Sequence, residues 1–194
     1  MNIGNRPRLY NLLHRLRLIS ASSQTHPNER ACLCRHIRNA QVAVEIGTYM
    51  GLTASEMAAA LPQGGLLYCV DPYPGDVAIQ QIALRTIERA GQSARIRMVR
   101  TDSAGAVAHL PAQVDFFFVD GDHSFEGLQR DWVVVKQLLK PGAIAAFHDT
   151  HRVPGATVHS EGAIRFYDEV IAKDPDFEPV ETVLSLNVIR RKAA

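Results

Sequence analysis

The stretch "VDFFFVDGDHSFEG", residues 114–127, joins an apolar run to a cluster of ionisable side chains. Five of its first six residues are apolar, and Asp120, Asp122 and His123 follow directly. A run this apolar indicates a strand that is buried on both faces. In open α/β sheets, ligands bind beyond the carboxyl ends of such strands. We therefore expect the two carboxylates and the imidazole to lie at the mouth of a cleft.

The same alternation of apolar runs and helical patterns continues along the chain and predicts an α/β fold. Helices covering both faces of a mostly parallel sheet account for strands that read as continuous apolar runs. The expected strands are 42–47, 66–71, 95–102, 114–121 and 142–149, with two more within 177–192, and the expected helices are 48–61, 76–91, 103–110, 124–139 and 161–174. At the end of each of the first five strands, acids or histidines follow the apolar run, at Glu45, Asp71, Asp102, Asp120 and His148-Asp149.

Composition and charge indicate an ordinary soluble protein of one main domain. Hydrophobic residues make up 46% and charged residues 21% of the 194 residues. No apolar run approaches the ~18 residues of a membrane span, and no secretory signal is present, so we expect a cytoplasmic protein without a membrane span. Three cysteines, Cys32, Cys34 and Cys69, then read as reduced thiols. The C-x-C pair lacks a second pair that would complete a zinc site.

The N-terminal part differs in charge from the rest. Residues 1–40 carry seven arginines and one glutamate, whereas the whole chain has a net charge of +1. We interpret residues 1–39 as a basic helical extension, with one helix over 6–20 and a second that starts within the polar segment 22–30 and ends near Asn39, and residues 40–194 as the main domain. Because the main domain is net acidic, we expect no nucleic-acid substrate. The extension caps the site or forms an oligomer contact such as a homodimer.

A glycine turn and two acids favour an adenosine-type ligand. "EIGTYMGLTA" places Gly47 and Gly51 where a strand turns into a helix, with spacing unlike the G-x-G-x-x-G of pyrophosphate-binding turns. Asp71 follows the next strand, where an acid accepts hydrogen bonds from ribose hydroxyls, or else begins a turn. Asp102 and Ser103 either cap a short helix or contact a base ring.

Five motifs carry a family resemblance. "VEIGTYMGLTA", "LYCVDPY", "RTDSAGAVAHL", "FFFVDGDHSFEGLQRDW" and "LLKPGAIAAFHDT" resemble class I S-adenosylmethionine-dependent methyltransferases, in the branch with D-G-D-H-S and H-D motifs. The resemblance covers about residues 40–170. It implies a Rossmann-like, doubly wound, seven-stranded sheet whose last strand is antiparallel. It also implies S-adenosylmethionine as cofactor, with the binding residues Glu45, Gly47, Thr48, Tyr49 and Gly51 around the methionine part, Asp71 at the ribose, Asp102 and Ser103 at the adenine, and Asp120 between cofactor and acceptor.

The resemblance also implies how the acceptor loses its proton. Related catechol-type O-methyltransferases bind a divalent ion at positions that match Asp120, His148 and Asp149. His148 departs from the usual acid, which shifts the preference from magnesium toward manganese, iron or zinc, or argues for no metal. Without a metal, His123 or His148 is the general base. We expect Asp120, His123 and His148 to be the catalytic residues.

The leading interpretation is O-methylation of a small-molecule or sugar-like hydroxyl acceptor. Two alternatives are a metal-dependent hydrolase that uses the aspartates and histidines of the rim, and a non-catalytic member that binds the cofactor. A dehydrogenase is disfavoured because the pyrophosphate-binding glycine pattern is absent.

Overall fold

Seven strands form one sheet in the computed structural model, which describes residues 6–74, 77–157 and 159–193. Residues 1–5 of the expected extension, Asp76 at the start of an expected helix, and the last residue of the main domain lie outside this part. The strands are β1 Val42–Ile46, β2 Leu66–Val70, β3 Ile96–Val99, β4 Val114–Val119, β5 Leu139–Phe147, β6 Phe177–Val183 and β7 Leu186–Arg191.

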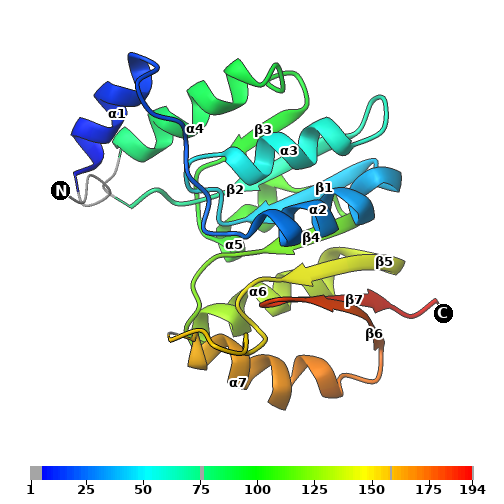
Figure 1. Cartoon of the computed structure of the whole chain (residues 1–194). Coiled ribbons are helices and arrows are strands. Elements are labelled where there is room, and N and C mark those ends of the chain that lie inside the picture. The colour runs from blue at the N-terminus through cyan, green and yellow to red at the C-terminus, as the bar shows by residue number, and fades with distance from the viewer. Residues whose placement is uncertain (1–5, 75–76, 158, 194) are drawn as a thin grey trace.

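The sheet has the order β3-β2-β1-β4-β5-β7-β6 (Figure 1). Strands β1 to β5 pair in parallel, while β7 lies antiparallel between β5 and β6. The predicted Rossmann-like sheet with an antiparallel last strand is thereby confirmed. The strand order reverses between β1 and β4, and the cleft of a doubly wound sheet forms at such a reversal.

Helices cover both faces of the sheet. The α-helices are α1 Pro7–Arg15, α2 Pro27–His36, α3 Leu52–Ala60, α4 Val77–Arg89, α5 Ser103–Ala106, α6 Phe125–Leu138 and α7 Glu161–Glu169, and short 3-10 helices are η2 Ile37–Asn39, η3 Val107–His109 and η4 Ile171–Lys173. In β4, Phe116 and Phe118 pack with α2 and α3, whereas Phe117 and Val119 pack with α6 and α7. Side chains alternate between the faces of a strand, so a strand covered on both sides must be apolar throughout.

Strand β5 begins earlier than the sequence predicted. Pro141 and Gly142 indicated the end of a helix, yet β5 already starts at Leu139 and contains both residues. Leu139 pairs with Val114 of β4, and the register shifts before the next pair. This irregularity accommodates a proline, which cannot donate to a regular ladder.

Helix α1 lies against α4 at one end of the molecule (Figure 1). Hydrogen bonds join the two helices: Asn11 donates to the Gln81 side chain at 2.8 Å, and Arg89 donates to the carbonyl of His14 at 2.9 Å. Leu12 and Leu16 of the expected apolar stripe stay more than half exposed. Among the described residues, no helix combines the length and apolar character that crossing a membrane requires.

Candidate functional site

A cavity of about 640 Å³ opens where β1, β2, β3 and β4 end. Parallel strands bring their carboxyl ends to one edge, so residues far apart in sequence meet there. Of the predicted cofactor-binding residues, only Gly51 is absent from the lining; it lies beneath, at the start of α3 with φ +76°. The others line the cavity: Glu45, Gly47, Thr48, Tyr49, Asp71, Asp102, Ser103 and Asp120.

The glycine turn after β1 packs directly on the end of β4. Gly47 has φ +89°, and a Cβ there would lie 2.0 Å from the backbone oxygen of Asp120. Asp71 fixes the same turn, because its Oδ2 accepts hydrogen bonds from the backbone N–H of Thr48 at 3.0 Å and of Tyr49 at 2.9 Å. Its Oδ1 accepts from the N–H of Tyr73 at 2.8 Å. Since a carboxylate offers about four acceptor positions, Asp71 keeps capacity for a hydroxyl.

Glu45 is an unpaired acid in the cavity wall. It is fully buried, and neither of its oxygens has a hydrogen-bond partner of normal geometry among the described residues. Burial raises the pKa of Glu45 to about 8, although the nearby Cys69 thiol and Thr48 hydroxyl lower it somewhat. A buried carboxyl without a partner is costly. A cationic ligand, such as an amine, would therefore satisfy it.

The short helix α5 forms the wall beyond β3. Asp102 is its N-cap and accepts a hydrogen bond from the Gly105 N–H at 2.8 Å. Of the two roles considered for Asp102, the side chain therefore takes the helix-capping one. The Ser103 hydroxyl donates to Asp131 of α6 at 2.5 Å. Burial raises the pKa of Asp131 to about 6. The sequence placed Asp131 in the middle of a helix and gave no sign that it lines this cavity.

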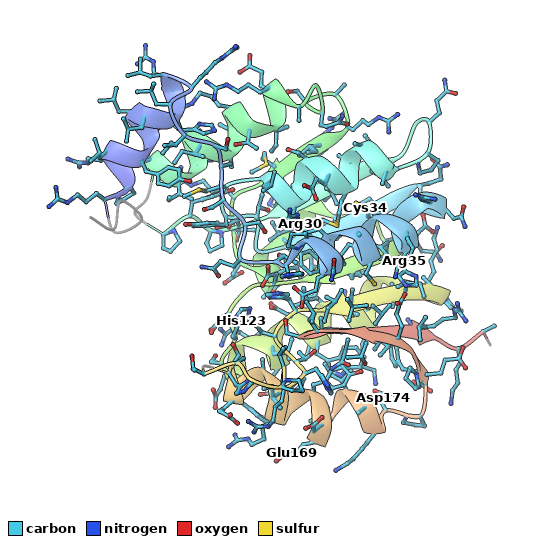
Figure 2. All side chains as sticks on the ribbon, in the orientation of Figure 1. Arg30, Cys34, Arg35, His123, Glu169 and Asp174 are labelled. Atoms are coloured by element: carbon cyan, nitrogen blue, oxygen red, sulfur yellow. The ribbon has the colours of Figure 1, made fainter. Side chains whose placement is uncertain are left out.

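Asp120 and two histidines form the rim on the far side of the cavity. Asp120 Oδ1 lies 3.1 Å from His123 Nε2 and 2.9 Å from His148 Nδ1. The second contact is close but not aligned as a hydrogen bond. Thr25 donates its hydroxyl to Asp120 Oδ2 at 3.2 Å. The next residue, Ser124, caps α6 by accepting a hydrogen bond from the Gly127 N–H at 2.9 Å. This cap fixes the start of the helix and so places His123 at the site. Figure 2 shows His123 at this edge of the sheet.

His148 lies between two carboxylates. Its Nε2 is 3.2 Å from Glu29 Oε2, on the side opposite Asp120. Burial alone would lower the pKa of His148, but the contacts with Asp120 and Glu29 outweigh it and raise the pKa to about 10. In this arrangement His148 is an imidazolium that is balanced by two acids.

Asp149 lies beside this cluster. Its Oδ2 is 3.3 Å from His123 Nδ1 and accepts the Ser160 hydroxyl at 3.0 Å, while its Oδ1 is 3.7 Å from His148 Nδ1. The three metal-type donors that converge here are instead Asp120, His123 and His148, whose ligand atoms lie within 4.8 Å of one another. The predicted trio with Asp149 stays a prediction.

A second, smaller cavity of about 280 Å³ lies on the other side of Asp149. Its lining combines polar side chains with apolar ones, among them Val153, Ile164 and Leu184. The sequence gave no sign that the N-terminal segment and the turn between β6 and β7 meet there. Its lining includes Gln24, His26, Glu29, His148, Asp149, His151, His159, Ser160, Leu184 and Ser185. Gln24 lines both cavities, so the two meet beside the Asp120 cluster.

Comparisons with known proteins agree with this geometry. Among curated relatives, the chain is 27% identical over 156 residues to tapetum-specific methyltransferase 1 of Arabidopsis thaliana, and 29% identical over 120 residues to a flavonoid 3',5'-methyltransferase of Vitis vinifera. These alignments cover 73% and 59% of this chain but only 65% and 49% of the relatives, so the chain spans about half to two thirds of their length.

Solved structures share the fold. The O-methyltransferase TomG from Streptomyces achromogenes, in complex with SAM, superposes with a TM-score of 0.69 at 18% identity and covers 97% of this chain and 90% of its own. An O-methyltransferase from Bacillus cereus, in complex with SAH, gives 0.67 at 20% identity and covers 95% and 90%. Residues 44–150, more than half of the chain, match the protein family described as "Methyltransferase domain". The chain belongs to this methyltransferase family.

Proposed function

We propose that the protein transfers a methyl group from S-adenosylmethionine to a hydroxyl of a small-molecule acceptor. The observation that carries this proposal is the unpaired, buried Glu45 at the head of a cavity that the predicted cofactor residues line. The methionine part of this cofactor carries an ammonium group, which would supply the cation that Glu45 lacks. The O-methyltransferases among the relatives and fold neighbours support the reaction class, and neither the hydrolase nor the non-catalytic alternative gains support from them.

Different residues of the cavity wall would bind different parts of the cofactor. Glu45 and the turn at Gly47 would hold the methionine part, and Asp71 the ribose. Asp102 and Ser103 would face the adenine. When bound, the cofactor supplies an electrophilic methyl group on a cationic sulfur. Carboxylates at the mouth of the cleft suit that positive charge, and the enzyme's main task is then to orient the acceptor and accept its proton.

His123 is the residue that would take the proton. Its Nε2 contacts Asp120, while its Nδ1 faces Asp149 and Ser160, where the second cavity begins. As the acceptor oxygen takes the methyl group that the cofactor supplies, its hydroxyl proton would pass to His123. His148, held between Glu29 and Asp120, would position the Asp120 carboxylate.

A divalent cation is also compatible with this rim. One carboxylate and two imidazoles form a donor set that suits manganese, iron or zinc better than magnesium. Asp120, His123 and His148 would hold such an ion, which when bound lowers the pKa of an acceptor hydroxyl. The proton on His148 would have to leave first.

The volume of the second cavity limits the size of the acceptor. At about 280 Å³ it is near the lower end of ligand pockets, ~300–1,000 Å³. A molecule of about one ring with several hydroxyl groups fits this volume and its histidine-rich lining. Ser22, Ser23 and Gln24 form part of the first cavity wall, and Thr25 contacts Asp120, which supports a covering role for the N-terminal segment. Its treatment as a separate unit, a homodimer contact and the exclusion of nucleic acid stay predictions.

The test is methyl transfer from isotope-labelled S-adenosylmethionine to a panel of single-ring catechols, phenols and sugars. We expect a mass gain of one labelled methyl group on at least one acceptor, with equimolar S-adenosylhomocysteine. Parallel reactions contain a chelator, or manganese, zinc or magnesium. Loss of activity with the chelator and its recovery with manganese or zinc would assign the deprotonation to the metal rather than to His123. Turnover of a hydrolysable substrate without the cofactor would contradict the proposal.

A further inference from the structure

A second group of metal-type side chains lies away from the proposed active site. Cys32 and His36 come from α2 and Glu181 from β6, and their ligand atoms all lie within 4.8 Å of one another. His36 Nε2 is 2.6 Å from Glu181 Oε1. Among the described residues, this group and the Asp120 cluster are the two in which three such side chains converge.

Helix geometry and a strand irregularity bring these residues together. Positions i and i+4 lie on the same face of a helix, so Cys32 and His36 project side by side from α2. Glu181 faces them from β6, just after the register of the β6–β7 pairing shifts between Pro179 and Glu181. The C-x-C motif lacked the second cysteine pair of a typical zinc site. In the folded chain, His36 and Glu181 supply the further ligand atoms beside Cys32.

We propose that Cys32 Sγ, His36 Nε2 and Glu181 Oε1 form a site for a borderline-soft divalent cation, zinc above all. Zinc takes thiolate, imidazole and carboxylate ligands with tetrahedral geometry, and three protein ligands leave the fourth position to water. Calcium and magnesium prefer all-oxygen shells, so a thiolate and an imidazole select against them. Binding converts the Cys32 thiol to a metal-bound thiolate, and its proton passes to solvent.

The surroundings support a reversible site. Cys32 is fully buried, whereas the His36 and Glu181 side chains are 19% and 32% exposed, so water and an ion have access from one side only. Arg35 donates to both oxygens of Glu181, at 3.0 and 3.2 Å. A ligating carboxylate is usually held by such an outer partner, and Arg35 also offsets the second negative charge of the donor set.

The position of the site suggests what it does. Figure 2 shows Arg35 near the end of the sheet opposite His123. Helix α2 connects the two ends, because its first turn carries Glu29, which contacts His148 and accepts hydrogen bonds from Ser185. An ion between the last turn of α2 and β6 would fasten the helix that supports the proposed active site. The ion would bind here whether or not the protein transfers a methyl group.

Cobalt(II) is the direct probe, because a thiolate ligand gives it a charge-transfer absorption in the near ultraviolet that oxygen and nitrogen ligands do not give. The reduced full-length protein is titrated with cobalt(II) and then with zinc. We expect a saturable thiolate-to-cobalt band that zinc abolishes, whether or not the Asp120 cluster takes up further cobalt. The Asp120 cluster contains no sulfur, so its occupancy cannot produce this band. The absence of a band in folded, reduced protein would overturn the proposal.

Matched variants assign the ligands. Cys32→Ser should remove the band, whereas Cys34→Ser, two residues away on the same helix, should keep it. Glu181→Gln should weaken cobalt(II) binding at least about tenfold, while Glu178→Gln on the same strand should have no effect. These glutamate variants also cover the case in which Cys32→Ser fails to fold. A band that survives in Cys32→Ser, or equal affinity in both glutamate variants, would contradict the assignment.

Zinc should also stabilise the fold. Because only the folded chain brings the three ligands together, free zinc at about 100-fold its dissociation constant should raise the unfolding midpoint by roughly 5–10 °C in a chain of this size. The Asp120 cluster could contribute to such a shift. The Cys32→Ser variant should therefore lose the part of the shift that belongs to this site, and an undiminished shift would count against it.

Discussion

Replacing Asp120 with asparagine is expected to lower the rate of methyl transfer about 10²–10⁴-fold, with a smaller change in S-adenosylhomocysteine affinity. The Asp120 carboxylate contacts His123 at 3.1 Å and His148 at 2.9 Å, and accepts the Thr25 hydroxyl. Asparagine keeps the shape but removes the negative charge that faces both imidazoles. His123 then loses the acid that orients it, and it becomes a weaker base. Steady-state rates at saturating cofactor measure the effect.

Asp122→Asn is the matched control for this substitution. Asp122 lies two residues further on and also borders the first cavity, but its side chain is 56% exposed and pairs with Arg130 at 3.0 Å rather than with either histidine. We expect the Asp122→Asn rate to stay within about threefold of the wild-type rate, because an exposed ion pair contributes little free energy. Should Asp120→Asn turn over as fast as Asp122→Asn, the roles given to His123 and His148 would be wrong.

Glu29→Ala is expected to destabilise the protein by about 3–5 kcal/mol at pH 7, the usual cost of leaving one member of a buried ion pair alone. Glu29 is 2% exposed and lies 3.2 Å from His148 Nε2. It also accepts hydrogen bonds from the N–H groups of His26 at 2.8 Å and Ser185 at 2.9 Å. The alanine variant leaves the His148 imidazolium and the donors of His26 and Ser185 without this partner. Urea unfolding measures the change.

The stability that Glu29 contributes should depend on pH in a defined direction. Burial alone would raise the pKa of Glu29, but hydrogen bonds from His148, Ser185 and His26 lower it from 4.5 to about 2. The folded state therefore favours the ionised form. The stabilisation is fully present above pH 4.5, the unfolded value, and is lost as the pH falls toward 2. The difference between wild type and Glu29→Ala should shrink over that interval.

Two further variants test this interpretation. Glu56→Ala, which breaks a partly exposed pair with Arg30 at 2.8 Å, should cost about 1 kcal/mol or less. Combining Glu29→Ala with His148→Gln should destabilise less than the sum of the two single changes, because the double variant leaves no unpaired imidazolium. Additive effects would show that Glu29 and His148 do not act as a pair.

The sheet and much of the first cavity follow from local sequence patterns. The apolar run 114–119 predicted a strand buried on both faces, and Phe116 and Phe117 do pack on opposite sides. Parallel strands end at one edge, so acids that follow them, such as Asp71 and Asp120, had to meet there.

Contacts from the N-terminal segment could not be predicted in this way. Thr25 reaches Asp120 across 95 residues, and Glu29 reaches His148 across 119. Locally, Glu29 reads as part of a helix start, and it does accept a hydrogen bond from the His26 N–H in a capping box. A side chain that satisfies a local rule gives no sign of a second, distant partner.

The most direct measurement of the central claim is calorimetric titration of S-adenosylhomocysteine at pH 6, 7 and 8. Its ammonium group favours ionised Glu45, whose pKa in the free protein is about 8. Binding should therefore release a proton below pH 8, and the affinity should rise with pH by up to about tenfold per unit. Glu45→Gln should bind more weakly and lose this pH dependence, and Asp71→Ala should also bind more weakly. Folded wild-type protein that gives no binding heat at any of these pH values would contradict the account.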